Sequence, residues 1–62
     1  MNHLEYYRRK AGLTQAELSE KIGADRSYIG KVENGKDMPG EKWKRVADIL
    51  GCTVDELLGK TR

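Results

Sequence analysis

Hydrophobic and other inward-facing positions recur along this chain at helical spacing. The first set, Leu4, Tyr7, Arg8 and Ala11, follows the i, i+3, i+4, i+7 order that places side chains on one face of an α-helix. Four later sets repeat it: Gln15, Leu18, Ser19 and Ile22; Ile29, Val32 and Glu33; Trp43, Val46, Ala47 and Leu50; and Val54, Leu57 and Leu58. The pattern predicts an all-α fold of five short helices joined by tight turns rather than strands.

Residues that cap helices stand at the expected ends of these segments. Three pairs have the capping-box spacing, in which a small polar side chain and a carboxylate three residues later satisfy the free N–H groups of a helix start. They are Asn2 with Glu5, Thr14 with Glu17, and Thr53 with Glu56. Asp25 is expected to cap the third helix. Glycines follow each patterned segment where a left-handed C-cap is favourable: Gly12, Gly23, Gly35, Gly51 and Gly59.

Length and composition indicate one small domain over residues 1–62. The chain has 62 residues, of which 37% are hydrophobic and 35% charged, enough for a single compact core. At this size folding buries only about 60% of the surface of the unfolded chain. Cys52 is the only cysteine, so no internal disulfide is possible and stability should be modest.

No stretch is long and apolar enough for a signal peptide or a membrane span, so a cytoplasmic protein is expected. The net charge of +2 is a weak argument for a polyanionic partner, and the distribution of the charges must decide. His3 and Cys52 are too few and too far apart for a zinc site or for cysteine–histidine chemistry. We therefore expect no enzyme, cofactor or metal, and we expect Trp43 to belong to the core.

The second and third helical segments have the spacing of a helix-turn-helix. Only Gly23 and Ala24 separate Ile22 from Asp25, so the chain must turn sharply between two helices, over residues 14–34 in all. The third helix, expected over about residues 25–34, turns a polar and basic face outward that consists of Arg26, Ser27, Gly30, Lys31 and Asn34. A face that presents donors and no acidic group suits the major groove of DNA, where guanine offers two acceptors.

These residues carry a resemblance to a known family, the phage repressor and Cro-like (XRE-type) helix-turn-helix domains, over nearly the whole chain. Its marks are Leu4 to Arg8, Gly12-Leu13-Thr14-Gln15, Glu17-Leu18, Ile22-Gly23, Arg26-Ser27-Tyr28-Ile29, Val32-Glu33-Asn34-Gly35, Val46-Ala47, Leu50-Gly51 and Val54-Asp55-Glu56-Leu57-Leu58. The chain departs from the family at Ser19, where alanine is usual, and at Gly30, inside the recognition helix. The resemblance implies a lambda-repressor-like fold.

The resemblance also implies roles at the DNA. Arg26, Ser27 and Lys31 fall on positions that face base edges in the family. Positions that contact the DNA backbone are matched by Gln15, Tyr28, Asn34, Lys36 and Lys42. Tyr28 either reaches a phosphate or lies over the helix. For Arg8-Arg9-Lys10, solubility is a simpler explanation than DNA contact.

Two further expectations concern the interior and the middle of the third helix. Arg8 and Glu33 both fall on inward faces, and a similar pair exists in the family, so an ion pair is predicted between them. Gly30 should cost about 1 kcal/mol relative to alanine inside a helix. It is either a tolerated weakness or a close approach to a base or sugar.

The functional prediction is a sequence-specific regulator of transcription, most simply a repressor, that binds double-stranded DNA through the third helix. A homodimer on a two-fold operator is expected, because one recognition helix reads only a few base pairs. By resemblance, the dimer contact should involve the last two helices and the turn around Met38 to Gly40. No small-molecule ligand is evident. The alternative is a protein-interaction module of the same fold, such as an antitoxin, which would need an apolar patch on the outer face of the third helix.

Overall fold

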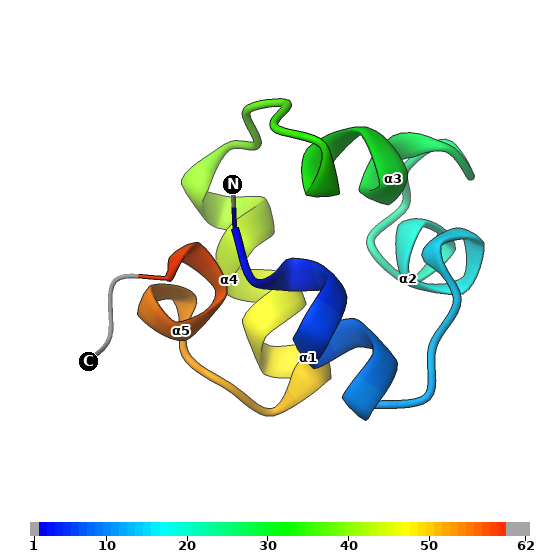
Figure 1. The fold of residues 1–62 in the computed structure, drawn as a ribbon. Helices are drawn as coiled ribbons and strands as arrows, with labels where there is room; N and C mark the ends of the chain where they lie inside the picture. Colours follow the sequence, from blue (N-terminus) through cyan, green and yellow to red (C-terminus); the bar gives the residue numbers. More distant parts are fainter. Residues whose placement is uncertain (1, 60–62) are drawn as a thin grey trace.

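A computed structural model describes residues 2–59 as five helices, with no strand among those residues (Figure 1). The helices are α1 (Leu4–Lys10), α2 (Gln15–Lys21), α3 (Tyr28–Glu33), α4 (Gly40–Leu50) and α5 (Val54–Leu58). The predicted all-α architecture of five short helices is thus confirmed. None of the described helices has the length and apolar character needed to cross a membrane.

One hydrophobic core joins all five helices. Its buried members are Leu4, Leu18, Ile22, Ile29, Val32, Met38, Trp43, Val46, Ala47 and Leu57. Most come from the inward positions that the periodicity predicts, and Trp43 belongs to the core as expected. Ala11, also predicted on an inward face, does not reach the core, because α1 ends at Lys10 and Ala11 is its exposed C-cap. Met38 adds a core residue from the loop between α3 and α4.

Two of the three predicted capping boxes are present. The Thr14 hydroxyl accepts from the backbone N–H of Glu17 at 3.0 Å, and the Glu17 carboxylate accepts from the Thr14 N–H at 2.8 Å. Thr53 and Glu56 repeat this arrangement at the start of α5. All five predicted glycines have positive φ. Among them Gly23, at φ +72°, reverses the chain after α2, a conformation that strains any side chain with a Cβ.

The predicted capping box at Asn2 is wrong. The N-cap of α1 is His3, one residue later, and its side chain makes no capping hydrogen bond. Asn2 instead accepts from the Leu4 N–H at 3.1 Å and donates its amide to the carbonyl of Val32 at 3.0 Å. Glu5 pairs with Arg9 on the surface of α1 at 2.9 Å. Asn2 does not form the capping box because its side chain binds a carbonyl at the end of α3 instead.

The packing leaves α3 along one edge of the molecule (Figure 1). Its closest neighbour is α2, while α4 packs on α5 and α5 also meets α1. The backbone N–H of His3 donates to the carbonyl of Leu57 at 2.8 Å, which joins the start of α1 to α5. In Figure 1, α3 follows the upper edge and α5 lies at the lower left, so one side of α3 faces away from the rest of the fold.

Candidate nucleic-acid interface

The segment from α2 to α3 forms the predicted helix-turn-helix, but its second helix begins later than expected. α3 starts at Tyr28 rather than near residue 25, and its N-cap is Ser27. Asp25 does not cap the helix: its carboxylate accepts from the Ser27 N–H at 3.1 Å and closes a turn ahead of it. The Tyr28 N–H donates to the Asp25 carbonyl at 2.9 Å, three residues back. Aspartate promotes such local turns in competition with helix, so Arg26 and Ser27 lie in the turn.

Ser19 supplies the hydrogen bonds that fix α3 against α2. The first N–H groups of a helix have no partner inside it, and the Ser27 side chain provides none here. The fully buried Ser19 hydroxyl accepts from the Ile29 N–H at 3.0 Å and donates to the Gln15 carbonyl at 2.8 Å. Ser19, where the family usually has alanine, is therefore a polar link between the two helices. A small polar residue on the inner face of the second helix is the only sign of it in the sequence.

Arg8 and Glu33 are in contact beneath the helix-turn-helix, where the inward faces of α1 and α3 meet. Arg8 Nε donates to Glu33 Oε2 at 2.6 Å, and the two side chains are only 8% and 7% exposed. Arg8 Nη1 also donates to the carbonyl of Leu13 at 2.8 Å. Gln15 Nε2 donates to the other carboxylate oxygen of Glu33, at 2.8 Å. The carboxylate of Glu33 thus joins α1, the start of α2 and α3, a role for Gln15 that the sequence does not reveal.

Gly30 faces Gln15, which neither interpretation of the sequence foresees. A Cβ added at Gly30 would stand 3.2 Å from Oε1 and 3.3 Å from Nε2 of Gln15. Such distances are tighter than ordinary van der Waals contact, so a larger residue would displace the amide. Gly30 is half-buried against α2 rather than on the outer face of α3. Its position makes room for the Gln15 side chain.

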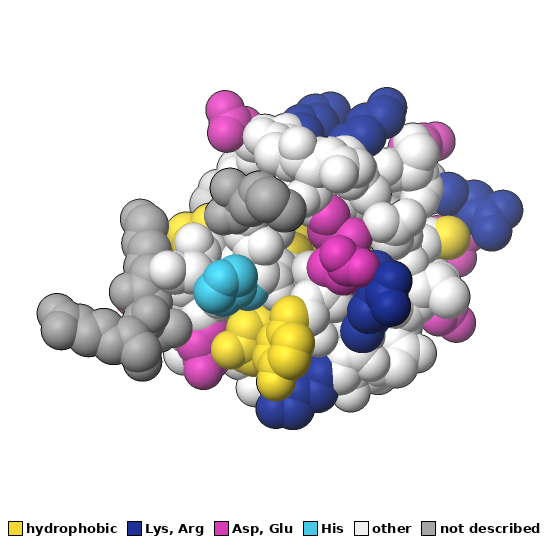
Figure 2. Space-filling model, in the orientation of Figure 1, with side chains coloured by type: hydrophobic (Ala, Val, Ile, Leu, Met, Phe, Trp, Pro, Cys, Tyr) yellow, Lys and Arg dark blue, Asp and Glu magenta, His cyan; other side chains and the backbone are white. Residues whose placement is uncertain are grey.

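Basic side chains gather along the exposed edge that α3 and its flanking turns form. Arg26, Ser27, Lys31, Asn34 and Lys36 are all exposed, and we call them the α3 strip. Figure 2 shows Lys and Arg side chains along the upper edge of the molecule, over α3.

The expectation of a face without acidic groups is wrong at one end of the α3 strip. Arg26 Nε lies 3.6 Å from Glu20 Oε2, and the Asp25 carboxylate holds Ser27. The hydrogen bonds from the Ser27 hydroxyl and N–H lower the pKa of Asp25, so this charge persists.

The remaining predicted backbone contacts flank the α3 strip. Tyr28 is half-buried, and the ammonium of Lys36 lies 5.2 Å from the centre of its ring, close enough for a cation–π contact. The amide of Asn34 donates to the Gly30 carbonyl at 2.9 Å at the end of α3. Lys42 is half-buried in the first turn of α4. The Tyr28 ring therefore lies beside the Lys36 ammonium in this structure, and its contact with a phosphate stays a prediction.

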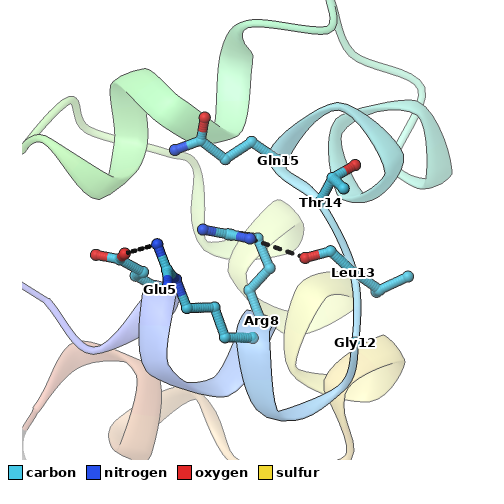
Figure 3. Close-up of a pocket in the computed structure, with 7 residues that line it drawn as sticks. Glu5, Arg8, Gly12, Leu13, Thr14 and Gln15 are labelled. Carbon is cyan, nitrogen blue, oxygen red and sulfur yellow. Dashed lines mark hydrogen bonds and ion pairs between the residues drawn. The ribbon is translucent and has the colours of Figure 1, made fainter.

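An open hollow of about 540 Å³ lies between α1 and the start of α2 (Figure 3). It is lined by Glu5, Arg8, Arg9, Gly12, Leu13, Thr14 and Gln15. In Figure 3 the guanidinium of Arg8 points to the carbonyl of Leu13, and Gln15 lies above both. Arg8 and Arg9 are already paired, with Glu33 and Glu5. Gln15, which donates to Glu33, lies at the start of α2 on the side of the hollow nearest α3.

Buried hydrogen bonds and a buried ion pair beneath an exposed basic edge define the class of this protein. It is a helix-turn-helix domain whose exposed edge suits a negatively charged polymer. The profile of the helix-turn-helix family matches residues 4–57. Since that match covers most of the chain, the protein belongs to the XRE-type helix-turn-helix family of DNA-binding transcription regulators.

Curated relatives agree with this family. An uncharacterized HTH-type transcriptional regulator of Methanocaldococcus jannaschii is 35% identical over 57 residues, which are 90% of this chain and 86% of the relative. The HTH-type transcriptional activator BcrR of Enterococcus faecalis is 38% identical over 56 residues. That match covers 89% of this chain but only 28% of the activator. No solved structure gives a significant match.

Proposed function

We propose that this domain binds a specific site on duplex DNA by placing α3 and the turn before it in the major groove. The observation that carries the proposal is the α3 strip: exposed donors along one edge, fixed from below by Ser19 and Glu33. A helix presented in this way reads bases, while lysines at its margin neutralise phosphates. The site of action is the cytoplasm, on the chromosome.

Within the α3 strip we assign base reading to Arg26, Ser27 and Lys31. Arg26 and Lys31 are exposed donors at the start and middle of the reading segment, and such side chains favour the O6 and N7 acceptors of guanine. Arg26 must leave its long 3.6 Å contact with Glu20 to do so. An exposed pair of this kind is worth little, so DNA can displace it.

We assign contacts with the DNA backbone to residues around this reading segment: Gln15, Tyr28, Asn34, Lys36 and Lys42. Gln15 stands at the first position of α2, where the helix dipole favours a phosphate, and Glu33 orients its amide. Lys36, over the Tyr28 ring, brings a charge to the margin of the groove. These contacts would fix the position of the domain without selecting sequence.

We further propose that two copies bind a two-fold operator, with half-sites about one helical turn apart, because one α3 reads too few base pairs for useful specificity. The contact between copies is assigned to α4, α5 and the turn before α4. Met38 of that turn belongs to the core, so the exposed Pro39 and Gly40 would form the contact there. Ile49, 36% exposed on α4, adds apolar surface to this proposed contact.

Repression is the proposed outcome, because occupation of a promoter is enough to block transcription. The E. faecalis relative is named an activator, but this chain matches only 28% of it, so the likeness concerns the DNA-binding part. The alternative of a protein-interaction module at α3 lacks the apolar patch it needs. Among the described residues the exposed large hydrophobic side chains are Tyr6 and Ile49, and neither is on α3.

The test is selection of bound duplexes from a random pool, followed by binding titrations. Arg26→Ala and Lys31→Ala should each cost about 1 to 3 kcal/mol on the selected site, relax it at one or two base pairs and affect random DNA much less. Lys36→Ala, the matched control, should weaken all duplexes alike and reduce the salt dependence. For a dimer with about four phosphate contacts per copy, the slope of log K against log salt should be near −7. Unchanged site preferences in Arg26→Ala and Lys31→Ala, or a slope near zero, would contradict the proposal.

A further inference from the structure

The hydroxyl proton of Ser27 is already committed to a neighbouring carboxylate. Ser27 Oγ lies 2.6 Å from Asp25 Oδ2, and the backbone N–H of Ser27 donates to the same oxygen at 3.1 Å. An ionised carboxylate can only accept, so the proton in the short contact is that of the serine. The hydroxyl that is exposed at the start of α3 therefore offers its lone pairs and no proton.

Two features hold this hydrogen bond in place. It is charge-assisted, and bonds to an ionised acceptor are about twice as strong as neutral ones. The backbone bond from Ser27 to the same oxygen also fixes the carboxylate in the turn. These bonds lower the pKa of Asp25, so the carboxylate is ionised at neutral pH and does not return the proton.

Ser27 lies where a reading helix meets bases. Ser27, Lys31 and Asn34 have the i, i+4, i+7 spacing of one helix face, and all three are exposed. Residues at the N-terminal end of a recognition helix contact base edges in the major groove. The committed hydroxyl thus stands beside Lys31, which can only donate.

We propose that Ser27 selects an amino base, adenine or cytosine, on the strand it faces, by accepting a hydrogen bond from the exocyclic amino group, and that Asp25 imposes this choice by holding the hydroxyl proton. The inference rests on the proposed binding of DNA through α3. In the major groove adenine N6 and cytosine N4 are donors, whereas guanine O6 and thymine O4 are acceptors. A serine normally contacts either kind, because its hydroxyl rotates.

The size of the selection follows from what a keto base would require. To donate to guanine or thymine, the Ser27 hydroxyl must give up its hydrogen bond to Asp25. The Asp25 oxygen then faces a lone pair of the Ser27 oxygen, or must accept from water instead. A net loss at the lower end of the range for a charge-assisted bond corresponds to about a ten-fold weaker complex. Each half-site should therefore contain one position where adenine or cytosine is preferred about ten-fold, beside the guanines read by Arg26 and Lys31.

The experiment compares selected duplexes for the wild type and four variants. Ser27→Ala identifies the position, because the preference for an amino base should vanish there and nowhere else. Asp25→Ala frees the hydroxyl proton, so the same position should lose its preference while the others keep theirs. Asp25→Asn, whose neutral amide oxygen can still accept the same proton in a bond about half as strong, should keep a weaker preference of about three-fold. Glu5→Ala on the surface of α1 should change nothing. An amino preference that survives in Asp25→Ala, or a keto preference at the Ser27 position of the wild type, would overturn the proposal.

A second measurement needs no DNA. In an NMR titration of the side-chain carboxyl carbons, Ser27→Ala should raise the pKa of Asp25 toward that of an ordinary aspartate. An unchanged pKa would show that the hydroxyl is not committed in solution and would overturn the assignment of Ser27 alone. A wild type that binds no duplex would overturn the proposed function, and this assignment with it.

Discussion

Glu33 is the residue on which three parts of the fold depend, since its carboxylate accepts from Arg8 and Gln15. With both charged side chains more than nine-tenths buried, removal of one partner leaves a charge without compensation. We expect Arg8→Ala and Glu33→Ala each to lower the free energy of unfolding by about 3 to 5 kcal/mol, which could unfold so small a domain. Glu33→Gln, which keeps the shape, is the milder variant. Thermal denaturation followed by circular dichroism measures these changes, and an unchanged melting temperature in both alanine variants would contradict the buried pair.

Gly30 is expected to lower the stability of α3 but to leave room for the Gln15 side chain. Alanine should gain about 1 kcal/mol from helix propensity, but its Cβ must push aside the Gln15 amide. With Gln15 present, Gly30→Ala should therefore raise the free energy of unfolding by less than this amount, and DNA binding should weaken. The matched background is Gln15→Ala, in which Gly30→Ala should show the full gain and no further loss of binding. Equal effects in both backgrounds, measured by denaturation and DNA titration, would mean that the contact has no consequence.

At the scale of elements, α3 has only six residues and cannot be stable alone. Its position comes from Ser19 of α2, Asp25 in the turn and Glu33 over α1. The inner faces and two capping boxes could be predicted from the sequence, because helical periodicity and cap chemistry are local. The late start of α3 and the link through Ser19 could not, because they depend on a turn that competes with helix and on a partner ten residues away.

The two capping boxes provide a matched test of how α2 supports the α3 strip. Thr14→Ala and Thr53→Ala should each cost about 1 kcal/mol of stability. Only Thr14→Ala should also weaken binding to a duplex with a single half-site, where no contact between copies is needed, because Gln15 follows Thr14 directly. Hydrogen bonds from the Thr14 N–H and hydroxyl lower the pKa of Glu17, so the stability they add is complete above the pKa of an unfolded glutamate and is lost as the pH falls through the lowered value. That acid-sensitive part should shrink in Thr14→Ala. Equal binding losses in the two variants would count against a specific role for α2.

At the scale of the whole molecule, the excess of charge is small and its placement decides the function. A net charge of +2 does not identify a DNA-binding protein, but the packing brings Arg26, Lys31 and Lys36 to one edge. The sequence predicts which residues form this edge, by periodicity and by resemblance. It does not predict the carboxylates of Glu20 and Asp25 beside them, because those contacts depend on how the turn folds. The same turn converts Ser27 from a general polar contact into an acceptor.

The most direct test of DNA binding through α3 is an NMR titration of the ¹⁵N-labelled protein with a duplex selected by the wild type. Backbone amide shifts should concentrate at Gln15 and at residues 26–36, and saturate with the amount of duplex added. The amides of Tyr6 and Lys10 on the exposed side of α1 should stay in place. Shifts centred on Tyr6 and Lys10 with residues 26–36 unmoved, or no saturable shift at all, would contradict the proposed mode of binding.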